Sequence, residues 1–77
     1  MSAYTDIIRS IDPTVNPVGV ECSMRLQFST LDHLSRAEFR EEVQVARECE
    51  RLEPGFLRRC AESFGMGAAF DAQEVQS

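Results

Sequence analysis

The chain of 77 residues is long enough for one domain, and its net charge of −5 comes from 13 acidic and 8 basic residues. This acidic balance argues against direct binding of nucleic acid, which requires a basic stripe to neutralise phosphates. It also argues against docking on anionic membranes. A core of this size seldom supplies more than ~3–5 kcal/mol of net stability. We therefore expect a protein partner, which could be a second copy of the chain in a homodimer.

Features that would send the chain to a membrane or a secretory route are missing from the sequence pattern. No apolar run approaches the ~20 residues that span a bilayer. The first six residues lack the basic and apolar regions of a signal peptide. Cys22, Cys49 and Cys60 form an odd set without close spacing, which favours reduced thiols over a disulfide framework. The expected location is the cytoplasm.

The first two predicted helices are separated by a short loop. The first covers about residues 3–10 and ends at the Asp12-Pro13 step, because a residue before proline is disfavoured in the α region. Its apolar side chains share one helical face: Tyr4, Ile7, Ile8 and Ile11. The second begins at Asn16-Pro17, an N-cap followed by proline at the first helical position. Gly19 in its first turn either lets another backbone approach closely or is a tolerated defect.

The third predicted helix covers residues 36–52 and has the strongest start signal in the chain. Ser35 with Glu38 three residues later has the spacing of a capping box. The fourth begins at Glu53-Pro54, carries an apolar stripe, and ends at Gly65 as a left-handed C-cap. The expected fold is all-α, a small three- to four-helix bundle formed by a single domain of residues 1–65. Residues 66–77 are expected to be a flexible or partner-docked C-terminal tail.

Residues capable of chemistry do not form a recognisable catalytic or metal-binding pattern. His33 follows Asp32 directly in a polar turn, which does not favour the geometry of a catalytic triad. The order Cys22, His33, Cys49, Cys60 contains no closely spaced ligand pair of the kind that structural zinc sites use. We therefore predict no enzyme activity, no metal and no cofactor. A small enzyme or metal-binding subunit that uses His33 or a cysteine is kept as the second alternative.

The leading functional prediction is a non-enzymatic protein–protein interaction module or small regulatory subunit that acts by helix-surface contact. Aromatic and arginine side chains are the usual anchors of protein interfaces. The predicted contact residues are Phe56, Arg58, Arg59 and Phe70.

The first alternative is an acidic inhibitor, encoded by a phage or mobile element, that blocks a nucleic-acid-binding protein. Its acidic face would be built from Glu38, Glu41 and Glu42, with Glu48 and Glu50 further along the same helix. Carboxylates near a helix N-terminus also complement the helix dipole, and this structural role alone is sufficient to explain the first three.

Overall fold

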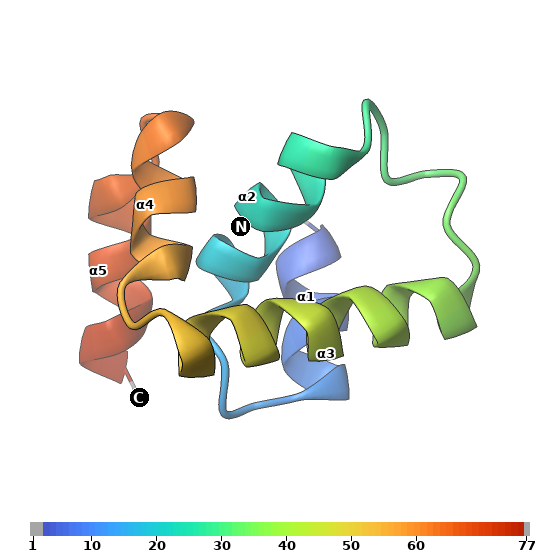
Figure 1. Cartoon of the computed structure of the whole chain (residues 1–77), viewed down its shortest axis with the longest axis horizontal. Coiled ribbons are helices and arrows are strands. Elements are labelled where there is room, and N and C mark those ends of the chain that lie inside the picture. Colours follow the sequence, from blue (N-terminus) through green and yellow to red (C-terminus); the bar gives the residue numbers. More distant parts are fainter. Residues whose placement is uncertain (1–2, 77) are drawn as a thin grey trace.

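A computed structural model of the chain describes residues 3–76, and the side chains of residues 3–74. These residues form five helices, and none of them is in a strand. The helices are α1 (Ala3–Ile11), α2 (Pro17–Gln27), α3 (Arg36–Leu52), α4 (Phe56–Ser63) and α5 (Gly67–Gln76). The predicted all-α class is confirmed. In the compact bundle of Figure 1, α2 lies at the centre and packs against each of the other four helices.

The start of α2 is held by Asn16, as the sequence predicts. The Asn16 Oδ1 atom accepts hydrogen bonds from the backbone N–H groups of Val18 at 3.1 Å and Gly19 at 3.5 Å. The Asn16 side-chain amide also donates to the backbone oxygen of Phe70 in α5, at 2.9 Å. One side chain therefore caps α2 and connects it to the C-terminal helix.

The longest helix, α3, begins with the predicted capping box. The Ser35 hydroxyl accepts from the Glu38 N–H at 3.1 Å, and Glu38 Oε1 accepts from the Ser35 N–H at 2.8 Å. The hydrogen bonds from Ser35 lower the pKa of the Glu38 carboxyl below its usual range. Further along, Arg47 pairs with Asp12 at 3.2 Å and fixes the loop between α1 and α2 against α3. Asn16 thus holds one end of this loop by a local contact, and Arg47 holds the other end from 35 positions away.

The connection between α3 and α4 differs from the prediction at Pro54. Helix α4 begins at Phe56, after Gly55 in the left-handed region at a φ of 93°. The Glu50 carboxylate, near the end of α3, accepts from the backbone N–H groups of Gly55 at 2.9 Å and Leu57 at 3.0 Å. A side chain of the preceding helix therefore satisfies donors at the start of α4, which has no side-chain cap of its own.

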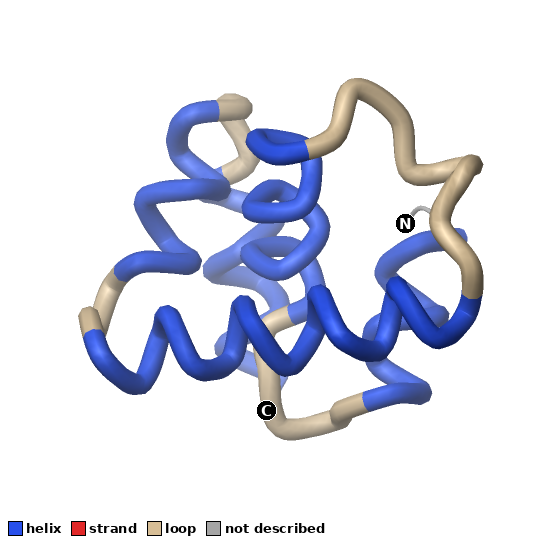
Figure 2. The backbone as a smooth tube through the Cα atoms, turned by 45° about the vertical axis from the view of Figure 1, so that its right-hand side comes forward, coloured by secondary structure: helices blue, strands red, loops and turns tan. Residues whose placement is uncertain are grey.

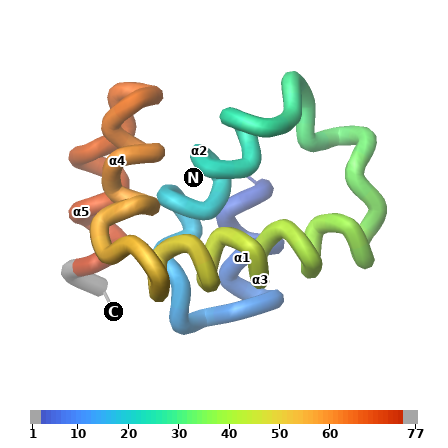
Figure 3. The backbone as a smooth tube through the Cα atoms, viewed as in Figure 1, coloured from blue at the N-terminus to red at the C-terminus, as the bar shows by residue number. Residues whose placement is uncertain are grey.

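The end of α4 follows the prediction, whereas the segment after it does not. Gly65 has a φ of 69°, and its N–H donates to the Glu62 oxygen while the Met66 N–H donates to Ala61, the Schellman pattern. Residues 67–76, expected to be part of a flexible or partner-docked tail, instead form α5 and pack against α2 and α4. The reason is Phe70, whose side chain is buried in the core. Figure 3 shows the chain reversing direction between α4 and α5.

Gly19 is where α2 and α4 approach most closely, which resolves the two interpretations of this glycine. A Cβ atom built on Gly19 would lie 2.6 Å from Leu57 Cβ, 2.8 Å from Phe70 Cε2 and 3.1 Å from the Leu57 carbonyl oxygen. These distances are shorter than van der Waals contact, so only glycine fits at this crossing without a shift of α4 or α5. The close approach of another backbone is the correct interpretation.

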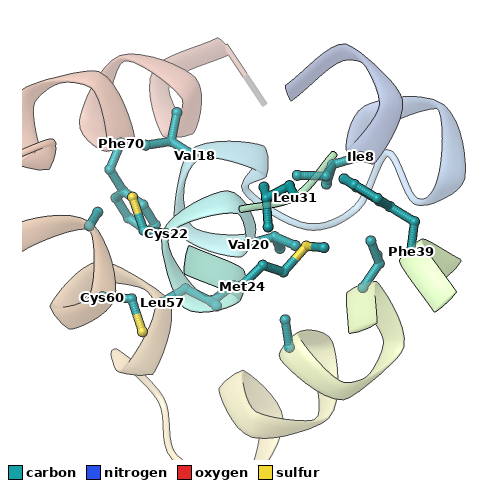
Figure 4. Packing of buried hydrophobic residues seen from close by; sticks show 13 residues of the cluster. Ile8, Val18, Val20, Cys22, Met24, Leu31, Phe39, Leu57, Cys60 and Phe70 are labelled. Carbon is teal, nitrogen blue, oxygen red and sulfur yellow. The ribbon is translucent and has the colours of Figure 1, made fainter. Parts of the chain in front are cut away.

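The hydrophobic core surrounds α2 on several sides. Figure 4 shows Val20 and Met24 directed toward Ile8, Leu31 and Phe39, while Leu57 and Phe70 lie on the side of α4 and α5. At the edge, the Tyr4 ring stacks on Phe39 with centroids 6.1 Å apart. The Arg25 guanidinium lies over the same Tyr4 ring, 5.6 Å from its centroid. The aromatic contacts join α1 to α2 and α3.

No helix in residues 3–76 is long and apolar enough to cross a bilayer.

Candidate functional site

The four predicted contact residues are not on one surface. Phe70 is only 6% exposed and belongs to the core, so its assignment as a partner contact is wrong in this fold. Its insertion against Gly19 is the physical reason. Phe56 is half-buried at the first position of α4, packed against the core. Arg58 pairs with Asp71 at 2.8 Å, and Arg59 pairs with Glu53 at 3.1 Å. Both arginines are exposed. Arg58 connects α4 to α5, and Arg59 connects α4 to the residue that follows α3.

Several carboxylates of the predicted acidic face form hydrogen bonds or ion pairs within the chain. Glu38 belongs to the capping box, and Glu50 caps the start of α4. Glu48 pairs with Arg51 one turn later, which lowers the pKa of the Glu48 carboxyl. Glu41 is exposed and Glu42 is half-buried. The five residues therefore do not form one continuous acidic surface, and the inhibitor interpretation stays a prediction without a supporting observation.

The residues considered for metal binding do not form a metal-binding group in the described residues, although Cys60 is close enough to Cys22 and Cys49 for their charges to interact. His33 is exposed in the loop before α3. No group of three or more His, Cys, Asp or Glu side chains in the described part of the chain is arranged to hold a metal ion. Cys22 and Cys60 are each 3% exposed, and burial raises the pKa of both thiols. Cys49, on α3, is half-buried.

This difference in burial predicts selective alkylation of the native protein by iodoacetamide. Cys49 should react first, whereas Cys22 and Cys60 should react only when the fold opens. With ~3–5 kcal/mol of net stability, we expect the two buried thiols to react about 150- to 5,000-fold more slowly. Peptide mass spectrometry over a time course measures the three rates, and urea-unfolded protein is the control. Equal rates for all three thiols in the native protein would contradict the packing around α2.

In two of the surface pockets, polar lining residues are engaged in contacts that stabilise the fold. A pocket of ≈ 270 Å³ lies between the loop before α2, α3 and α5, and its polar residues include Asn16, Glu50 and Arg47. All three make the capping or loop contacts described above. A second pocket of ≈ 290 Å³ lies between α1 and the start of α3. The Tyr4 hydroxyl at its edge donates to the Asp32 carboxylate. Neither lining includes His33 or a cysteine.

A third surface feature consists of three exposed apolar side chains, which we call the apolar end patch: Leu26, Phe64 and Met66. Leu26 is 57% exposed, Phe64 43% and Met66 40%. Leu26 is in the last turn of α2, and the other two follow the end of α4. Helices α2 and α4 run in similar directions, so their C-terminal ends lie at the same, upper end of the bundle in Figure 1, where α2 leans away from α4. In Figure 2 the tan loops that follow these two helices also lie at the top.

A shallow pocket of ≈ 170 Å³ opens at the apolar end patch. It is lined by Glu21, Cys22, Arg25, Phe64 and Met66. Leu26 is four residues after Cys22 and so lies on the same side of α2, one turn beyond the pocket floor. Arg25 pairs with Glu21 at 3.1 Å. The apolar end patch thus combines an exposed leucine, one turn beyond Cys22, with a shallow pocket whose two charged lining residues pair with each other.

Comparison with known proteins found no matching family model, curated protein or solved structure. The candidate site therefore depends on the geometry of this chain alone. The sequence pattern marks Phe64 only as part of the stripe on α4. The absence of charged residues from 26–31 and 63–70 could have indicated an uncharged surface. Nothing in the sequence, however, places these two segments together.

Proposed function

We propose that this chain is a non-enzymatic protein–protein interaction module that binds its partner through the apolar end patch. The observation that carries the proposal is the group of three large apolar side chains, each at least 40% exposed, at one end of the bundle. Exposed apolar clusters with a polar rim mark interaction sites in soluble proteins. The proposed activity requires no cofactor, metal or catalytic residue. The three free thiols favour a reducing, cytoplasmic environment.

Of the contact residues predicted on α4, only Arg58 is part of this proposal. Arg58 forms an ion pair with Glu62 at 3.8 Å, and Glu62 lies two residues before Phe64. Arg58 therefore belongs to the polar rim, where charged side chains affect the association rate more than affinity. Phe56 is the first residue of α4, and Arg59 pairs with Glu53 beyond the end of α3, so neither is part of the proposed surface.

Site-specific photo-crosslinking in living cells tests the proposal. A photoreactive phenylalanine analogue replaces Phe64 in one variant and His33, which is exposed outside the apolar end patch, in the control. We expect protein crosslinks from position 64, identified by mass spectrometry, and few from position 33. Adding Leu26→Arg should abolish the crosslinks from position 64. Equal crosslinking at both positions, or none at position 64, would refute the proposed surface.

A further inference from the structure

We propose that the partner at the apolar end patch is a second copy of this chain, in a two-fold symmetric dimer. This inference rests on the proposed function and names the occupant of the same surface. It is carried by the distribution of charge at this end of the molecule, by the shape of the apolar end patch and by the area that the patch offers.

Charge restricts which surface can face a second copy. Each molecule has a net charge of −5, so two copies repel each other, and the cost is lowest where the facing surfaces have no unpaired charge. In this chain 27% of residues are charged, yet residues 26–31 and 63–70 contain none. These two segments begin at the last residues of α2 and α4, and the second continues into α5. The charged residues that flank the two segments are Arg25, Asp32, Glu62 and Asp71. Arg25 pairs with Glu21, Arg58 pairs with both Glu62 and Asp71, and Asp32 accepts a hydrogen bond from the Tyr4 hydroxyl.

The exposed apolar residues on α3 provide a contrast. Val45 is 41% and Leu52 69% exposed, seven residues apart on the same face of the helix. Charged residues are dense around them, because residues 45–53 contain five, among them Arg51 and Glu53, which pair with Glu48 and Arg59. A second copy seated there would have to desolvate these charges. We therefore assign the homotypic contact to the apolar end patch and not to α3.

The shape of the apolar end patch also fits a copy of itself. A two-fold interface uses the same residues on both molecules, so a protruding side chain must meet a hollow within the same patch. Leu26 is 57% exposed one turn beyond Cys22, which lines the ≈ 170 Å³ pocket together with Phe64, Met66, Glu21 and Arg25. In a two-fold dimer, Leu26 of each copy can enter the pocket of the other. Glu21 and Arg25 already pair with each other, so an entering apolar side chain requires no new hydrogen bond.

The small size of the apolar end patch predicts weak association. Stable complexes bury about 800 Å² on each partner. Three partly exposed side chains at the end of a bundle supply only a part of that area. We therefore expect a dissociation constant above about 1 µM, so that the dimer forms reversibly with concentration.

Sedimentation equilibrium of the purified full chain tests this inference, from about 10 µM to about 1 mM protein. We expect a reversible monomer–dimer equilibrium. Raising NaCl from about 0.05 to about 1 M should strengthen dimerisation, because salt screens the repulsion between two negative molecules and the interface has no ion pair to weaken. An interface held by ion pairs would respond with the opposite sign.

Two matched variants locate the interface. Leu26→Arg and Leu52→Arg each replace an exposed leucine in the last turn of a helix, and each changes the net charge by the same amount, −5 + 1 = −4. Leu26→Arg should weaken dimerisation by about tenfold or more, because it places two like charges in an apolar contact. Leu52→Arg should leave dimerisation unchanged or slightly stronger. Circular dichroism of both variants checks that the helical fold is kept.

Three results would overturn the inference: a monomer at every concentration, a dimer that salt dissociates, or a dimer lost in Leu52→Arg but kept in Leu26→Arg. A purified monomer whose position 64 still crosslinks a different protein in cells would refute the second copy as occupant and leave the proposed function standing. A purified monomer without crosslinks at position 64 would refute both.

Discussion

Replacing Gly19 with alanine should lower the free energy of unfolding by about 2 kcal/mol, although alanine is the better helix former by about 1 kcal/mol. The added methyl group would lie 2.6 Å from Leu57 Cβ and 2.8 Å from Phe70 Cε2. The Leu57 carbonyl oxygen, at 3.1 Å, is backbone and cannot rotate away. Helices α4 and α5 would have to move outward together, which loosens the contacts of two buried side chains.

Urea denaturation followed by circular dichroism measures this change, with Gly67→Ala as the matched control. A Cβ at Gly67 would be 3.6 Å from Glu62 Cγ, an ordinary contact, at the first residue of α5. We expect Gly67→Ala to be neutral or to stabilise the fold by up to about 1 kcal/mol. Gly19→Val should unfold the chain, because ~3–5 kcal/mol of total stability cannot absorb a larger clash. A Gly19→Ala variant as stable as the original protein would show that α2 and α4 are further apart.

The helix starts that could be predicted from the sequence depend on neighbours within a few residues. Asn16 caps donors two and three residues later, and Ser35 and Glu38 bond each other across one turn. Gly65 ends α4 through two backbone hydrogen bonds made by residues next to it. Because such contacts are local, the residue types at a fixed spacing are sufficient to predict them.

The features that the sequence did not reveal depend on residues far apart in the chain. Phe70 is buried because it meets Gly19, 51 positions earlier, and this contact makes α5 part of the bundle. The two glycines that flank Met66 made the same segment resemble a loose tail. The apolar end patch likewise exists only because α2 and α4 run in the same direction, which brings Leu26 to the same end as Phe64. Helical periodicity assigns these side chains to faces, but it does not determine which helix ends meet.

Replacing Glu50 with alanine should destabilise the fold by about 2 kcal/mol, because the α3–α4 corner would lose both of its side-chain acceptors. The Glu50 carboxylate accepts from Gly55 and Leu57, and Leu57 is 2% exposed. Its negative charge also lies at the positive end of α4, where an anion is favoured. Water can reach part of this half-buried site, which keeps the expected loss below that of two fully buried, unpaired amides.

Glu50→Gln and Glu41→Ala separate the sources of this effect. Glutamine keeps one acceptor oxygen without the charge, so it should lose about half as much stability as alanine. Glu41 is exposed on the same helix, and its replacement should change stability by no more than about 0.5 kcal/mol. Urea denaturation gives the three free energies, and amide hydrogen exchange should show faster exchange at Gly55 and Leu57 in both Glu50 variants. If those two amides kept their protection in Glu50→Ala, another group would have to be capping α4, and the corner would not depend on Glu50.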